Sequence, residues 1–439
     1  MSHGKTEVMV PEEAAKRGPI IKGELRSSEI KIPGILAQFS NITPQSKKAK
    51  IYLYPTLEQA KRLLQERSPF AFTGSFVSRE GVDEEWSSTE IWIEPGVTIT
   101  HREMRCLTHV SGRLVDLHVK IVSRNTPERE MPKSAWFVMN GCLLLQILAT
   151  HEEHEIRQAK EYGIERPVYR FTLSDGATAE IRQITVQHSF EDEKEIKKRG
   201  FAIQVDGIKE GETVKRDIDR LLILASLASR EQSVCWHWSA NECPNVHKRH
   251  WRFGLGSNLA KRPDHEEPLV LRDAARFSEF LSLASKKYLS SSNGGLVDTA
   301  VFALLARELP LEVKIVRLLT GVQSALRFAV SPPEKANIGD LYREFQKQFT
   351  IDLSDLWPLH DKSSGVSLSA IRNAAVHGDV FTERDWIALS YAEEHLRWTL
   401  ERILLVSLGW GIKLSSVSPE KLRSYCAYDW KGQQQSLKL

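Results

Sequence analysis

The chain has 439 residues, of which 41% are hydrophobic and 27% are charged. This composition supplies enough apolar material for at least one large core, which excludes global disorder, and the length predicts two or three domains. Sixty Lys and Arg residues against 57 Asp and Glu residues leave a formal net charge of +3. The overall charge therefore gives no sign of general nucleic-acid coating or membrane-surface binding. Five cysteines are too few for a disulfide framework and fit a reducing cytosol.

The sequence shows no targeting or membrane-spanning segment. The first 17 residues mix Lys, Glu and Pro and contain no apolar core of a signal peptide. The longest apolar runs, at 141–149 and 403–410, are much shorter than the roughly 20 residues that a bilayer crossing needs. We therefore expect a cytoplasmic protein that does not associate with membranes.

The N-terminal part of the chain has the pattern of a β-sheet. Residues 1–18 read as a polar tail, and residues 19–267 as a β-rich region. One short helix is expected at 57–65. Short runs of β-branched and aromatic residues end at Pro, Gly, Asn or Asp and predict strands at 51–54, 71–77, 89–93, 97–100, 112–121, 168–173 and 180–186. A helix at 213–230 and a hairpin at 234–238 and 250–255 follow.

The C-terminal part has helical periodicity almost throughout. Apolar residues recur every three or four positions and predict helices at 273–288, 297–308, 311–328, 338–349, 367–376 and 383–408. We therefore predict an α+β protein, with an all-α domain at 268–427 and a polar tail at 428–439.

One motif stands out within these helices. Arg372, Asn373 and His377 form the pattern R-N-x-x-x-H, and Gly378 follows directly. Positions five apart on a helix diverge by about 140°, so the imidazole can approach the Arg side only if the helix ends there. Gly378 is suited to that ending, and Ser367 or Ser369 to capping the helix start.

This motif, near the end of an all-α C-terminal domain, resembles the HEPN superfamily of nucleic-acid-directed domains. The preceding β-rich region resembles the layout of Apea-like HEPN proteins of bacterial anti-phage defence. The resemblance implies a helical bundle, a homodimer and RNA cleavage without a cofactor. It places Arg372 and His377 at the two catalytic positions and Asn373 at the polar position after the Arg.

The chemistry of these side chains suits that reaction. Metal-free RNA cleavage needs a group that activates the ribose 2′-OH and one that protonates the 5′-oxygen leaving group. His377 can donate or accept a proton near neutral pH, Arg372 can stabilise the added negative charge on the phosphate, and Asn373 can hold the phosphate by hydrogen bonds. Alternatively, Arg372 is bound to carbonyls or an acid, and His377 only complements the helix C-terminus. Arg113 and His118 share the spacing in a predicted strand, where alternation places them on opposite faces.

The hairpin after the first long helix carries a second cluster. Cys235, His237, Cys243 and His247, with His250 nearby, could bind a tetrahedral Zn²⁺ ion, although their spacing matches no recognised zinc motif. The alternative is a metal-free hairpin with partly buried tryptophans.

The same hairpin is rich in basic and aromatic residues. Lys248, Arg249, Trp251 and Arg252 suit an RNA groove, in which cations meet phosphates and rings stack on bases. A solvated basic turn is the alternative.

Two classes of function remain. The first is a metal-independent endoribonuclease of phage defence and host shutdown (abortive infection), in which the N-terminal region recognises a phage-derived or nucleic-acid trigger. The second is a non-catalytic HEPN-like module that binds RNA or a partner protein. A nucleotidyl-modifying or toxin–antitoxin role is a weaker third. The sequence does not identify the RNA target or the trigger.

Overall fold

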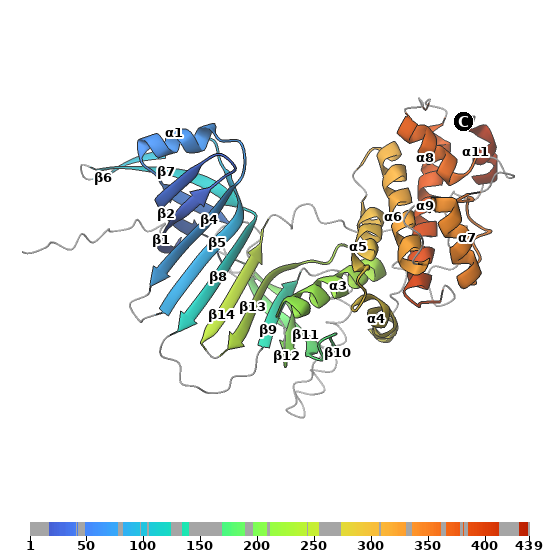
Figure 1. Ribbon diagram of the computed structural model, residues 1–439, viewed down its shortest axis with the longest axis horizontal. Coiled ribbons are helices and arrows are strands. Elements are labelled where there is room, and N and C mark those ends of the chain that lie inside the picture. Colours follow the sequence, from blue (N-terminus) through green and yellow to red (C-terminus); the bar gives the residue numbers. More distant parts are fainter. Residues whose placement is uncertain are drawn as a thin grey trace, which may run out of the picture. The chain divides into compact units, whose positions relative to one another are not determined.

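The computed structural model describes most of the chain and shows a mixed α+β protein (Figure 1). The described residues are 17–40, 42, 49–77, 82–96, 98–102, 105–123, 134–139, 169–188, 196–208, 211–243, 245–253, 274–306, 309–330, 336–360, 366–377, 381, 385–411 and 430–437. None of the helices within these ranges has an apolar stretch as long as a bilayer crossing requires.

The chain divides into two compact units. The first unit comprises Met1–Asn140, Asp175–Gly211 and Val234–Asn258, and the second comprises Gly141–Ser174, Glu212–Ser233 and Leu259–Leu439. This division differs from the expected single boundary near residue 267, because the first long helix of the chain groups with the C-terminal helices.

The first unit is built on an antiparallel sheet and one short helix, α1 (Leu57–Gln65). The strands of this unit are β1 (Arg17–Arg26), β2 (Lys31–Ser40), β3 (Lys50–Tyr54), β4 (Phe70–Val77), β5 (Val82–Ile93), β6 (Thr98–Arg102), β7 (Arg105–Leu114), β8 (Asp116–Ser123), β9 (Ser134–Met139), β11 (Thr178–His188), β12 (Ile196–Asp206), β13 (Cys235–Cys243) and β14 (Val246–Arg252). Their order in the sheet is β11-β12-β9-β13-β14-β8-β5-β4-β1-β2-β3-β7-β6. Strand β10 (Tyr169–Thr172) falls in the chain segment of the second unit.

Six of these strands close into a barrel. The long strand β5 pairs with β8 over its first half and with β7 near its end, where Ile91 lies opposite Leu114. Because β7 also pairs with β3, the ring β5-β4-β1-β2-β3-β7 returns to β5 and leaves none of its members as an edge strand.

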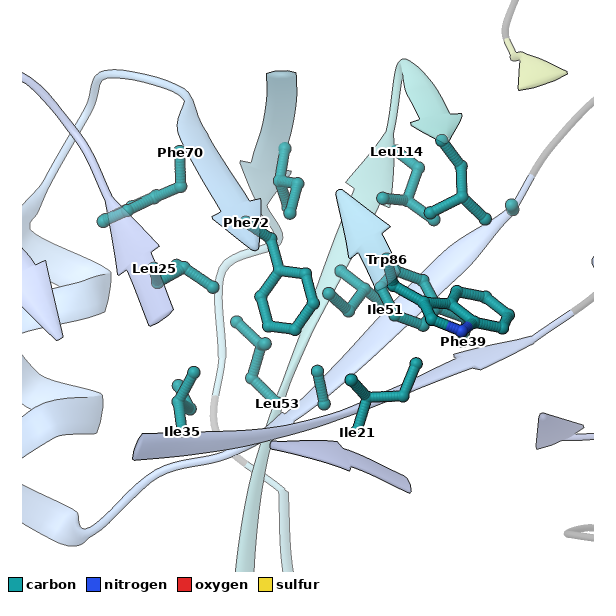
Figure 2. Close-up of a cluster of buried hydrophobic side chains, with 14 of the residues drawn as sticks. Ile21, Leu25, Ile35, Phe39, Ile51, Leu53, Phe70, Phe72, Trp86 and Leu114 are labelled. Carbon is teal, nitrogen blue, oxygen red and sulfur yellow. The ribbon is translucent and has the colours of Figure 1, made fainter. Parts of the chain in front are cut away.

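The barrel interior is filled by large apolar side chains from alternate strand positions (Figure 2). The Phe39 ring stacks on Trp86 at a centroid distance of 5.1 Å and meets Phe72 edge-on at 5.6 Å. Leu63 of α1 belongs to the same cluster, so the helix closes one end of the barrel. The barrel is therefore a packed core.

One predicted strand proved to be two. The run expected at 112–121 bends at Val115, where β7 ends and β8 begins. At this bend the chain leaves the barrel and enters the open part of the sheet, because β8 pairs with β5 and β14.

The second unit is helical. Its helices within the described residues are α3 (Gly211–Ser229), α4 (Ala274–Tyr288), α5 (Gly294–Leu305), α6 (Leu311–Val330), α7 (Ile338–Gln348), α8 (Leu368–His377), α9 (Trp386–Ser407) and α11 (Trp430–Ser436). Helix α6 packs against α5, α7, α8 and α9, and α9 also packs against α5 and α11. The predicted helices thus form, with ends shifted by a few residues.

The C-terminal segment differs from the expected polar tail. Residues 430–436 form α11, whose Trp430 is buried and stacks on Trp357 at a centroid distance of 6.1 Å. A single apolar residue among polar ones carries no helical periodicity, which is why the sequence pattern did not reveal this helix.

Two arginines bond α3 to the other helices of its unit. The guanidinium of Arg220 donates to the carbonyl oxygens of Tyr288, at 3.0 Å, and Ser291, at 2.9 Å, where α4 ends. Arg230, directly after α3, forms a buried ion pair with Glu401 of α9. Charged groups of this kind are buried only when they are paired, so α3 is an integral part of the helical unit.

This buried pair predicts a large stability effect. Arg230→Ala leaves the Glu401 carboxylate buried without its guanidinium, and we expect a loss of about 3–5 kcal/mol in the unfolding free energy of the helical unit. Chemical denaturation followed by far-ultraviolet circular dichroism measures the change. The matched control is Arg343→Ala, which removes an ion pair with Asp340 in which the Arg side chain is 70% exposed. We expect that variant to lie within about 0.5 kcal/mol of the wild type, and equal losses in both variants would contradict the argument.

Candidate functional site

Helix α8 carries the predicted motif, and its sequence divides the helix into two faces. Leu368, Ile371 and Ala374 are buried against the helical unit. Arg372 and His377 are exposed on the opposite side. The spacing of three residues between the buried positions is the pattern of a helix that packs on one side only.

Serine begins this helix, as the sequence predicted. The Ser367 side chain is the cap, since its hydroxyl accepts a hydrogen bond from the Ala370 backbone N–H at 3.3 Å. The hydroxyl of Ser369, the other candidate, lies 3.0 Å from that of Ser367. The backbone N–H groups of Leu368 and Ser369 donate to the carbonyls of Pro358 and Leu359 at 3.0 and 3.1 Å. The start of α8 is thereby attached to the preceding loop.

That loop is in turn attached to two other helices. The Trp357 indole N–H donates to the Val366 carbonyl at 2.7 Å, and the Gln434 amide of α11 donates to the same oxygen at 2.9 Å. The Trp357 backbone N–H donates to Nδ1 of His395 in α9 at 3.1 Å. The motif helix therefore begins on a rigid, hydrogen-bonded support.

The polar residues of the motif are all exposed. Arg372 donates to the Asn373 side-chain oxygen at 3.0 Å, and both side chains are exposed. Helical geometry separates Arg372 from His377 by about 140°, with the exposed Val376 between them. His377 is the last described residue of α8, and Gly378, at which we expected the helix to end, lies outside the described residues.

The exposed side of α8 therefore carries a permanent cation, an amide and an imidazole. A guanidinium can stabilise an anionic transition state, and an accessible imidazole can exchange protons with a substrate. These are the types of side chain that phosphodiester cleavage without a metal uses.

Comparisons with known proteins add no further information. No family model, no curated protein and no solved structure matches this chain. The candidate site consequently depends on its residues and their geometry.

The second pair with the same spacing has a different environment. Arg113 is on β7 and His118 on β8, on either side of the bend at Val115. The His118 Nε2 is 3.4 Å from an Asp116 oxygen, and its Nδ1 is 2.8 Å from Nδ1 of His250. This imidazole thus takes part in a hydrogen-bonded network within the sheet and does not form a site with Arg113.

The Asp116 carboxylate anchors that network. It accepts hydrogen bonds from the Thr89 backbone N–H at 2.8 Å and the Ser88 hydroxyl at 3.0 Å. Although burial opposes ionisation, hydrogen bonds from His118, Thr89 and Ser88 hold the pKa of Asp116 well below its usual range. The sequence did not indicate this cluster, because its members come from β5, β8 and β14 and meet only through strand pairing.

Two of the candidate zinc residues of the hairpin, Cys235 and His237, are engaged in other bonds. Cys235 is buried, and its Sγ donates to the His237 carbonyl at 3.1 Å. The Nδ1 of His237 lies 2.9 Å from the His250 carbonyl, an acceptor, so this nitrogen carries the proton. Within the described part of the chain, no group of three or more His, Cys, Asp or Glu side chains is placed to hold a metal ion; the Cys243 side chain lies outside it.

The predicted RNA-binding residues of β14 do not form one surface. Trp251 belongs to the barrel core and is only 3% exposed, so the expectation that its ring stacks on a base is wrong. Strand alternation places Lys248 and Arg252 on one face and Arg249 on the other. The sequence showed that this strand is basic, whereas which of its two faces is buried depends on where the strand lies in the sheet.

Burial of the hairpin predicts a pH dependence of stability. Burial lowers the pKa of His237 to about 4, whereas the unfolded chain has a value near 6.5. Protons therefore bind preferentially to the unfolded state, and stability falls as the pH drops from about 6.5 to 4, by about 3 kcal/mol in all. Urea unfolding at pH 7, 5.5 and 4.5 tests this, followed by the near-ultraviolet signal of the tryptophans. His237→Asn should flatten the profile over this window, and an unchanged profile in that variant would contradict the assignment.

Proposed function

We propose that this chain is a metal-independent endoribonuclease of the HEPN type that acts in bacterial anti-phage defence. The observation that carries the proposal is that Arg372, Asn373 and His377 are all exposed on one helix, α8, with Arg372 hydrogen-bonded to Asn373. The resemblance of this motif to HEPN nucleases is the basis for proposing RNA cleavage as the reaction. The setting in the cytoplasm, with host shutdown as the outcome, follows from the same resemblance.

Each side chain has a role in this reaction. His377 takes the proton of the ribose 2′-OH or donates one to the departing 5′-oxygen, because an imidazole exchanges protons near neutral pH. Arg372 neutralises the extra charge on the phosphorane-like transition state. Asn373, which accepts a hydrogen bond from Arg372, orients the guanidinium and presents its own N–H groups to the phosphate.

The β-rich unit is proposed to recognise a phage-derived or nucleic-acid trigger and to regulate cleavage. It has its own core in the closed barrel, and the chain leaves and re-enters it on either side of α3. Through Arg220 and Arg230, α3 is bonded to α4 and α9. A structural change in the β unit would therefore reach the helical unit along the chain through α3.

Cleavage of RNA without metal is the first test. Purified full-length protein is incubated with tRNA and total RNA in the presence and absence of EDTA. We expect cleavage that survives EDTA and that falls by about 10²–10⁴-fold in Arg372→Ala and in His377→Ala. Both side chains are exposed, so these variants should retain the wild-type circular dichroism spectrum.

The control variant is Arg113→Ala, which removes an exposed Arg with the same spacing to a His, and its cleavage should match the wild type. Normal cleavage by either motif variant would refute the site. Measurable RNA binding without cleavage by the wild type would instead support a non-catalytic binding module.

The proposal also includes a homodimer with a composite site. One motif supplies one Arg and one His, whereas the reaction needs a base, an acid and charge stabilisation. A two-fold axis beside α8 would bring two copies of the motif together, and the same surface patch of each chain would form the interface. Val376, which is 50% exposed between the motif residues, is an apolar side chain that such an interface would cover.

Light scattering at micromolar concentration should therefore give twice the mass of one chain. Arg372→Ala protein mixed with His377→Ala protein under subunit exchange should recover part of the activity, whereas each variant alone stays inactive. A monomeric protein with full activity would contradict the composite site.

A further inference from the structure

A second imidazole lies beside the motif helix. His360 is in the loop before α8, and its Nδ1 is 3.3 Å from the Ser369 hydroxyl, which in turn is 3.0 Å from that of Ser367. The neighbouring Leu359 is buried, whereas the His360 side chain itself is exposed. An exposed imidazole is thus held in one orientation by α8.

Helix α7 provides the other support for this ring. A methyl group added at Gly339 would lie 2.8 Å from both Cδ2 and Nε2 of His360 and 3.2 Å from Cε1. Near-equal distances to three ring atoms place that position over the face of the ring, not at its edge. Gly339 therefore packs against one face of the imidazole, and no residue with a side chain allows the same approach. Since the residue is still exposed, its accessibility comes from the opposite face and edge.

The location of the ring relative to the motif is set by α8. Ser369 precedes Arg372 by three residues and Asn373 by four, so it is their neighbour on the helix surface. His377 is eight residues from Ser369, which corresponds to about 12 Å along the helix axis. His360 is therefore adjacent to the Arg372 end of the motif and is too far from His377 to act on the same phosphate within one chain.

We propose that His360 binds the RNA substrate next to the cleaved phosphate, by stacking the face of its ring opposite Gly339 on an unpaired base. The inference rests on the proposed function and specifies the substrate as single-stranded RNA at this position. Unpaired bases are commonly held by His and aromatic rings, and a ring fixed in advance loses little entropy on binding. Because the contact is remote from the reacting bond, it contributes to binding and not to the chemical step.

The test compares three variants of the full-length protein on one single-stranded RNA oligonucleotide. His360→Ala removes the ring, Gly339→Ala displaces it, and His360→Phe keeps a flat ring without the bond to Ser369. The control is Gly295→Ala, since Gly295 is also the second residue of its helix, α5, and an added methyl group there has nothing within 4 Å. Affinity is measured by fluorescence anisotropy in the His377→Ala background, in which the proposed reaction does not cleave the RNA, and cleavage by initial rates in the wild-type background.

We expect His360→Ala and Gly339→Ala to raise Kd and KM by at least about fivefold, the lower end for loss of one stacked base, with kcat within about twofold. His360→Phe and Gly295→Ala should stay near the wild type. If His360→Ala binds as the wild type does, or if His360→Phe is as weak as His360→Ala, the inference is wrong.

The two proposals can fail separately. A wild-type protein that binds the oligonucleotide through His360 without cleaving it contradicts only the proposed nuclease. Cleavage that depends on Arg372 and His377 but not on His360 contradicts only this inference.

Discussion

The position of the motif helix depends on the hydrogen bonds of Trp357. Its backbone N–H is bonded to His395 of α9, its indole N–H to the Val366 carbonyl just before α8, and its ring stacks on Trp430 of α11. The bond to His395 is buried and the bond to Val366 is partly buried, so breaking either leaves a polar group with little access to water, which is costly. The bond from Trp357 also requires an unprotonated Nδ1 on His395, so this imidazole is neutral and has a structural role.

The histidines around α8 fall into two kinds, one buried and structural and the others exposed. His395 is buried and fixes the helices, whereas His360, beside the start of α8, and His377, its last described residue, are exposed. Between them lie Arg372 and Asn373. A surface that is polar, accessible and attached to a rigid bundle is suited to hold a flexible single strand, because the protein pays little ordering entropy on binding.

Local patterns predicted most of the individual elements, because each depends on residues close in the chain. The helix at 57–65 has the predicted bounds, since Thr56 and Gln59 form a capping box at its start. The motif was likewise found from a short run of sequence, and its residues lie on the exposed side of a helix, as the periodicity predicted.

Features that depend on long-range packing could not be predicted in this way. The barrel closes because β5 pairs with three strands, which no local pattern records. The sequence did not show that Trp251 is buried in the core of the β unit. Nor did it show that His360 contacts Gly339 of α7 and Ser369 of α8, since these contacts form only in the folded chain. The grouping of α3 with the C-terminal helices follows from Arg220 and Arg230, whose partners are more than 60 residues away.

The chemical identity of the cleavage products tests the central claim most directly. If the 2′-OH attacks the phosphate under the control of His377, the products carry a 2′,3′-cyclic phosphate and a 5′-hydroxyl, and a 2′-deoxynucleotide at the cleaved position blocks the reaction. Mass spectrometry of a short oligonucleotide, with and without that substitution, identifies these ends. Products with a 5′-phosphate, or cleavage that continues at the 2′-deoxy position, would contradict the account.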